Sequence, residues 1–140
     1  MRRKAIVSCL LLLAAWIPLA SAQTTGARVM VDVPFRFHIG QQTFARGLYS
    51  FASEKDVLWV AEGHGPAKAR MLTNSFLGTS PASTGQVVFN CYRQECFLFQ
   101  VWFPDRDSGA QMLTSPMEAE CQKHKNTGVY MTLLGKETKR

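Results

Sequence analysis

Apolar and polar side chains alternate through residues 29–51, and this alternation constrains the fold more than any other feature of the chain. Successive side chains of a strand point to opposite faces, so a repeat of every second residue buries one face of a sheet. Pro34 cannot donate to a β-ladder and marks an edge, a bulge or a bend. Turn residues at 40–42 and 46–47 divide the stretch. The pattern predicts the front end of an antiparallel sheet, with an apolar face that begins with Val29, Val31, Val33, Phe35, Phe37 and Ile39.

Further short apolar runs follow at intervals of roughly ten residues, with turn formers between them, which is typical of an all-β sandwich or barrel. We expect strands at 57–60, 67–76, 86–91, 96–103 and 127–134, and a polar loop at 78–85. Ser115 followed by Glu118 resembles a capping box, with Pro116 at the first helical position. The prediction is therefore an all-β domain, a small antiparallel barrel or sandwich, with one short helix at 116–123 before the last strand. The expected core residues are Phe35, Phe37, Tyr49, Phe89 and Phe97.

The segment FLFQVWF, residues 97–103, is the most apolar part of the domain. Strict alternation would place Phe97, Phe99, Val101 and Phe103 on one face and Leu98, Gln100 and Trp102 on the other. Apolar residues on both faces indicate a central strand that is covered on both sides, or a strand that offers one face to a ligand.

The first 22 residues have the organisation of a secretory signal peptide. Three cations at positions 2–4 precede an apolar run at 5–17, and Ala20-Ser21-Ala22 provides a cleavage site. The run is shorter than the roughly 18–20 residues that span a bilayer. We expect cleavage after Ala22, leaving a single β-rich domain at 23–140 that is exported to the periplasm or the cell exterior.

Charge and hydropathy then limit the classes of partner. Cleavage would remove three cations and no acid, so the formal net charge would fall from +6 to +3. The remaining charges are scattered apart from a cationic C-terminal group, a pattern that does not favour nucleic-acid binding. No later segment is long and apolar enough to span a membrane. Charge and hydropathy identify no specific partner.

Three cysteines would remain after cleavage, namely Cys91, Cys96 and Cys121. In an oxidising compartment a disulfide is the first expectation. Cys91 and Cys96 flank a four-residue loop, and across a hairpin their Cα atoms would be within bridging range. A bridge from Cys121 to either of them is an alternative, and an odd count leaves one thiol free or available to another chain.

A metal site is a competing interpretation of the same cysteines. Cys91-x4-Cys96 with Cys121-x2-His124 offers four nitrogen and sulfur ligands, although the first spacing is loose for zinc. We expect His38 and His124 to be exposed at strand and tail positions, and His64 to occupy a turn. The sequence predicts no metal and no cofactor.

The sequence contains none of the common nucleophile, zinc-protease, P-loop or dinucleotide motifs, so no catalytic residue is predicted. The favoured interpretation is a non-enzymatic exported domain with a binding or structural role. One alternative is a small barrel that holds an apolar or carbohydrate ligand against aromatic residues, with Trp59 and Trp102 as candidates. A weaker one is a small hydrolase with an unrecognised site.

Several motifs resemble a family of short exported acidobacterial proteins whose typical patterns are VNVPFDFxVGxxxLPAGxYxV and VFHRYGDxYFLSQIW. The matching residues are Val31-x-Val33-Pro34-Phe35-x-Phe37, Gly40, Gly47-x-Tyr49, Leu72-Thr73-Asn74, Val88-Phe89 and Phe97-Leu98-x-Gln100-Val101-Trp102. The resemblance extends over nearly all of residues 23–140. It implies a β-rich exported domain and implies no catalytic residue.

The chain departs from that pattern at the cysteines. Asn90 and Cys91 stand where the family tends to have His and Arg, and Cys96 stands where it has Tyr. Ala45-Arg46-Gly47 replaces the usual Pro-Ala-Gly. The resemblance therefore says nothing about cysteine pairing.

Overall fold

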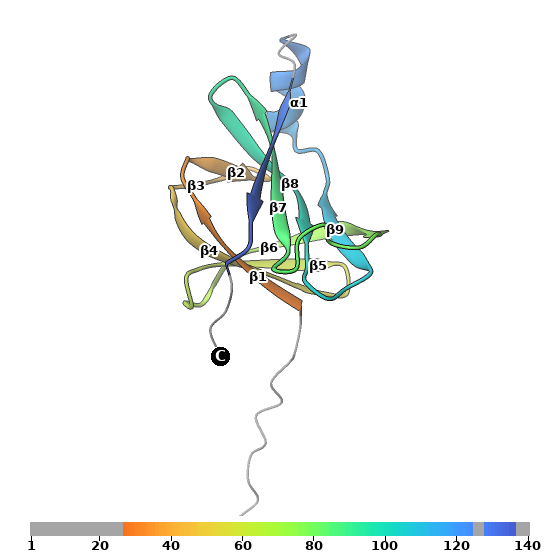
Figure 1. Cartoon of the computed structure of the whole chain (residues 1–140). Helices are drawn as coiled ribbons and strands as arrows, with labels where there is room; N and C mark the ends of the chain where they lie inside the picture. The colour runs from red at the N-terminus through yellow and green to blue at the C-terminus, as the bar shows by residue number, and fades with distance from the viewer. Residues whose placement is uncertain (1–26, 125–127, 137–140) are drawn as a thin grey trace, which may run out of the picture.

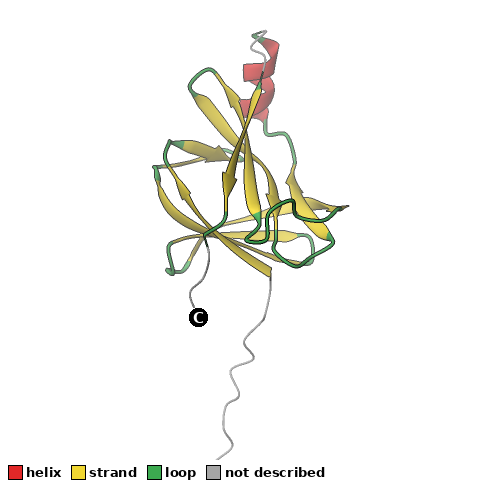
Figure 2. Cartoon of the chain, in the orientation of Figure 1, coloured by secondary structure: helices red, strands yellow, loops and turns green. Residues whose placement is uncertain are grey.

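A computed structural model describes residues 27–124 and 128–136. These residues form ten strands and one helix (Figures 1 and 2). The elements are β1 (Ala27–Val33), β2 (Phe37–Ile39), β3 (Gln42–Phe44), β4 (Gly47–Glu54), β5 (Val57–Glu62), β6 (Ala67–Leu77), β7 (Gln86–Tyr92), β8 (Glu95–Trp102), β9 (Ser108–Met112), α1 (Pro116–Lys123) and β10 (Val129–Leu134). The leader at 1–22 and Thr127, the expected start of the last strand, lie outside the described residues.

The strands form a strongly curled sheet in the order β1-β4-β5-β6-β9-β8-β2-β3, and β7 and β10 continue from the other edge of β8. β6 pairs with β5 through its first half and with β9 through its second half, so it links the two parts of the sheet. Among the strands of the described residues, the only parallel pairing is the short one between β2 and β8. The all-β prediction is confirmed.

The sheet is not closed into a complete barrel. β1 and β10 approach each other at their ends, where the Lys136 amide donates to the Met30 carbonyl at 2.7 Å. Figure 1 shows the lower end of β10 crossing close to β1. Within the described residues β1 pairs only with β4 and β10 pairs only with β7, so the sheet has an open seam between them.

The core fills the inside of the curled sheet. Phe37, Phe51 and Phe89 are its largest fully buried side chains. Phe37 packs edge-on against Tyr49 and Phe89 with ring centroids 5.0 and 5.3 Å apart, and such aromatic pairs add stability beyond their buried area. Of the expected core residues, Phe37, Tyr49, Phe89 and Phe97 are buried, whereas Phe35 is half-buried and packs edge-on against Phe89.

The expected division of faces in residues 97–103 is wrong. Leu98, Val101 and Phe103 enter the core, while Phe97 is buried outside it against Tyr92 and His38. The cause is a β-bulge, because Phe89 pairs with Leu98 and its neighbour Val88 pairs with Gln100. Phe99 is the extra residue, and an extra residue reverses the alternation that follows it.

The helix prediction is confirmed at 116–123, the residues of α1. Ser115 is its N-cap, and the Glu118 amide donates to the Ser115 hydroxyl at 3.2 Å. The polar loop at 78–85 carries no strand, as expected. Among the described residues, no helix has the length and apolar character that a bilayer-spanning helix requires.

Candidate functional site

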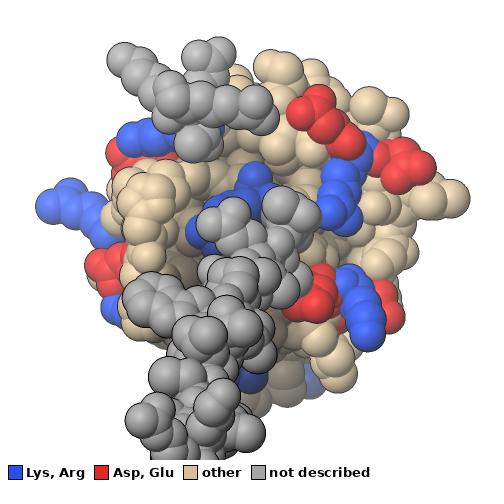
Figure 3. All heavy atoms as spheres, turned by 90° about the horizontal axis from the view of Figure 1, so that it is seen from below, with Lys and Arg blue, Asp and Glu red and all other residues tan. Residues whose placement is uncertain are grey.

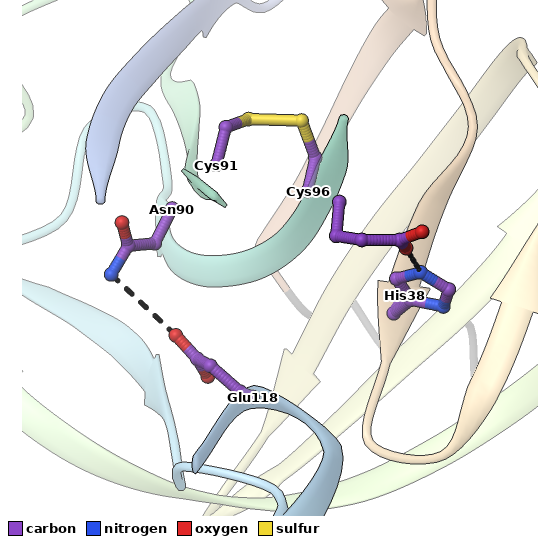
Figure 4. The surroundings of a disulfide bond; sticks show 6 residues. His38, Asn90, Cys91, Cys96 and Glu118 are labelled. Carbon is purple, nitrogen blue, oxygen red and sulfur yellow. Dashed lines mark hydrogen bonds and ion pairs between the residues drawn. A yellow bond between two sulfur atoms is a disulfide. The ribbon is translucent and has the colours of Figure 1, made fainter. Parts of the chain in front are cut away.

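The β7–β8 hairpin brings Cys91 and Cys96 together as the spacing suggested. They are directly paired across the ladder, with Cα atoms 4.0 Å apart and sulfur atoms at disulfide distance (Figure 4). β7 ends at Tyr92 and β8 begins at Glu95, so the connecting turn is tight. Both cysteines face the core and are nearly inaccessible.

The competing metal arrangement is not assembled. Cys121 is the unpaired cysteine of the described residues and lies on α1, half-buried. Burial raises the pKa of its thiol, and the negative charges of Glu95, Glu118 and Glu120 add to that increase. No three metal-ligating side chains converge anywhere in residues 27–124 and 128–136.

The outer face of the same hairpin carries a hydrogen-bonded polar cluster. His38 is 5% exposed, so the expectation of an exposed histidine is wrong. It lies between β3 and β8, where the ring packs on Phe97 at a centroid distance of 4.9 Å. Its Nε2 contacts the Glu95 carboxylate, and its Nδ1 is 2.9 Å from the Thr43 hydroxyl.

These contacts orient the imidazole. A carboxylate only accepts hydrogen bonds, so Nε2 carries the proton that His38 donates to Glu95. Nδ1 and the Thr43 hydroxyl share a hydrogen bond whose direction depends on the tautomer of the ring. A hydroxyl, an imidazole and a carboxylate in series also occur in nucleophilic enzymes. Here they join the β2–β3 hairpin to β8, which otherwise pairs with β2 at only Phe37↔Cys96 and His38↔Phe97.

A second polar group lies between β7 and α1. Tyr92 donates to a Glu118 carboxylate oxygen at 3.1 Å, and the amides of Asn90 and Gln122 donate to the Tyr92 hydroxyl at 2.8 and 2.9 Å. Glu118 is 7% exposed, and burial raises the pKa of its carboxyl, while hydrogen bonds from Tyr92 and Asn90 partly oppose the shift. Burial also raises the pKa of the Tyr92 hydroxyl. The group attaches α1 to the sheet.

The two tryptophans do not form a common site. Trp59 on β5 is half-buried beneath Arg70, whose guanidinium carbon is 4.3 Å from the ring centroid. Trp102 on β8 packs edge-on against Phe76 at 4.7 Å and donates to Gln100 at 3.2 Å. β6 and β9 separate their strands in the sheet order.

A groove of about 530 Å³ lies elsewhere, at the end of the molecule seen in Figure 3, and neither tryptophan lines it. Its walls include Arg28, Met30, His64, Thr84 and Lys136. Lys136 is also 3.5 Å from the Asp32 carboxylate. Figure 3 shows Lys and Arg beside Asp and Glu around this end, so the charges are mixed there.

The most exposed apolar surface on a single strand is that of β10. Val129 is 64% exposed, Tyr130 61%, Met131 41% and Leu134 63%. The residue pairs Val129↔Cys91 and Met131↔Phe89 place the first and third of these on the core side of the sheet. They stay accessible because β7 is the only strand of the described residues that pairs with β10, and β1 approaches it only at its end. On the outer side the Tyr130 ring stacks on Phe99 at 5.1 Å.

Sequence reasoning predicted the last strand but missed both its exposure and the polar cluster. One local signal was present, since VYMTLL has no charge and stands between Gly128 and Gly135. For the cluster there was no signal, because His38, Thr43 and Glu95 meet only through the pairing of β2 with β3 and β8.

Comparison with protein-family models, curated proteins and solved structures finds no match to this chain.

Proposed function

We propose that residues 23–140 form an exported, non-enzymatic module that binds another polypeptide by strand addition to β10. The observation that carries this proposal is the exposed apolar edge of β10. An edge strand presents unpaired backbone N–H and C=O groups that can pair with another chain. The apolar side chains at Val129, Tyr130, Met131 and Leu134 would provide contacts beyond the backbone bonds.

The composition of β10 supports a binding role for its edge. Soluble proteins usually protect an edge strand with charges, proline or a bulge. β10 has no charged residue and no proline, and its ladder with β7 runs without a register shift. An unprotected edge of this kind favours aggregation unless a partner covers it.

Site-specific photo-crosslinking tests the proposal in the cells that make the protein. A photoreactive phenylalanine at Tyr130 should give a discrete crosslinked product with a polypeptide. The same probe at Leu72, which is 69% exposed and pairs with Val57 of β5, is the matched control. A second substitution, Thr132→Lys, should abolish the Tyr130 product. Equal labelling from both positions, or none from Tyr130, would contradict a binding edge.

Export is the part of the proposal that rests on the leader sequence. Ala20-Ser21-Ala22 supports cleavage after Ala22. N-terminal sequencing of the protein from its native location should begin at Gln23, and a chain that retains Met1 would contradict export by this signal.

A hydrolase is the second candidate, favoured only by the Thr43–His38–Glu95 series. It would require Thr43 to act as the nucleophile with His38 as its base. We propose the structural role instead, because the His38 ring is enclosed and packs on Phe97. Ester hydrolysis that disappears in both Thr43→Val and His38→Ala, with the fold intact, would reverse this choice.

The ligand-binding alternative has less support than the β10 edge. Trp59 and Trp102 each pack on a neighbour and occupy strands that are not adjacent. If an apolar or carbohydrate ligand is nevertheless bound, its addition should change the tryptophan fluorescence, and Trp59→Phe or Trp102→Phe should weaken its binding.

A further inference from the structure

We infer that the polypeptide bound at β10 is a second copy of this chain, paired antiparallel with β10 about a two-fold axis. This inference rests on the proposed function and names its partner. In such a dimer each copy supplies the same strand, so one contact covers the β10 edge of both copies.

The symmetry limits the possible registers. Opposite residues of an antiparallel pair lie on the same face of the sheet. When both strands have the same sequence, two such residues are an even number of positions apart. A two-fold axis perpendicular to the sheet therefore passes beside one residue, which lies opposite its own copy. With Thr132 on the axis, Tyr130 of one copy faces Leu134 of the other, and Met131 faces Leu133. With Met131 on the axis, Tyr130 would instead face Thr132, and Leu134 would face Gly128. The first register pairs apolar side chains on both faces, and we therefore assign the axis to Thr132.

The charges near β10 are compatible with self-pairing. The strand is uncharged from Val129 to Leu134, so no like charges oppose each other across the axis. The nearest described cation in sequence, Lys136, lies beyond the proposed pairing, because its amide already donates to the Met30 carbonyl of β1 at 2.7 Å. It already has a negative neighbour in Asp32 at 3.5 Å.

The size of the surface indicates a reversible dimer. A standard stable interface buries about 800 Å² on each partner. One strand edge with four exposed apolar side chains, partly shared with the Phe99 ring, is smaller than that. We therefore expect a concentration-dependent monomer–dimer equilibrium. Because the contact is isologous, it closes at two copies and gives no longer assembly.

Sedimentation of purified protein comprising residues 23–140 measures this equilibrium directly. Thr132→Lys places two ammonium groups opposite each other on the axis and should weaken dimerisation at least about tenfold. Thr132 is exposed on an edge strand, so the variant should keep the unfolding temperature of the parent protein. Leu72→Lys introduces the same charge away from β10 and should leave the dimer unchanged.

A cysteine at the axis tests the register without relying on disruption. In a Cys121→Ser background, Thr132→Cys should form an intermolecular disulfide on mild oxidation, because Cα atoms across an antiparallel pair are about 4.5–5.5 Å apart. Leu72→Cys, the matched control, should not. Preferential crosslinking through Met131→Cys would overturn the assigned register.

The outcomes separate this inference from the proposed function. A parent protein that is monomeric at all concentrations, with a Tyr130 crosslink to a different polypeptide in cells, overturns self-pairing and leaves strand addition standing. Assemblies larger than two copies overturn the closed dimer. A monomer without any Tyr130 crosslink overturns both proposals.

Discussion

Cys91 and Cys96 face each other across the last pairs of the β7–β8 hairpin, with Cα atoms 4.0 Å apart. The tight turn Arg93–Gln94 holds this register, and Arg93 adopts a left-handed conformation with φ 54°. The two strands thus bring the sulfur atoms to the same face, as a disulfide requires.

We predict that the exported protein contains one free thiol per chain, that of Cys121. Titration of free thiols in denatured, unreduced protein beginning at Gln23 measures the number, and peptide mapping identifies the residue. Cys91→Ser with Cys96→Ser should destabilise the fold by about 2 kcal/mol, because the bridge closes only a short loop. Three free thiols would show that the pair stays reduced.

Phe37→Ala should lower the free energy of unfolding by about 3–5 kcal/mol. Phe37 is fully buried and contacts the rings of Phe44, Tyr49 and Phe89, so truncation leaves a cavity among them. Denaturant unfolding measures the loss. Leu72→Ala, at an exposed position, serves as the control with little change, and a Phe37 effect below about 1 kcal/mol would contradict its central position.

Glu118 should make the protein less stable as pH rises. Burial raises its folded-state pKa above the ordinary 4.5, so the folded protein holds this proton more tightly than the unfolded chain. The associated stability is present below pH 4.5 and is lost as pH rises through the raised folded value. Glu118→Gln removes this component while keeping an oxygen that accepts from Tyr92.

Unfolding temperatures measured from acid to neutral pH should therefore decline less steeply for Glu118→Gln than for the parent protein. Glu120→Gln, at an exposed position on the same helix, is the matched control. Identical pH profiles for the parent and the Glu118 variant would contradict an unfavourably buried carboxylate.

His38→Phe should keep the packing on Phe97 but lose both hydrogen bonds, at about 1 kcal/mol for each. Amide hydrogen exchange should then become faster in the β2–β3 hairpin. The bond to Thr43 joins β2 to β3, and the bond to Glu95 joins β2 to β8. Unchanged exchange there would show that backbone pairing alone holds the hairpin. Thr43→Val, which removes one of the two bonds, should have an intermediate effect.

Local patterns in the sequence determined the type and approximate position of most elements. The alternation around Phe35 and Phe37 predicted strands because side chains alternate between faces at every step of a strand. Ser115 and Pro116 predicted the start of α1 because capping depends on residues within one turn. The close approach of Cys91 and Cys96 followed from the few residues between them.

Only the tertiary structure decided which faces are covered and which strands are edges. Phe97 lies outside the core because a bulge in the β7–β8 hairpin displaces the alternation. His38 is buried against Phe97 and contacts Glu95, both far along the chain. The exposure of Met131 arises because β10 pairs with β7 and has no second paired strand among the described residues. Side-chain periodicity depends on neighbouring residues, whereas burial depends on which remote segments pack together. For that reason, the open edge could be recognised only once the strands had been placed in space.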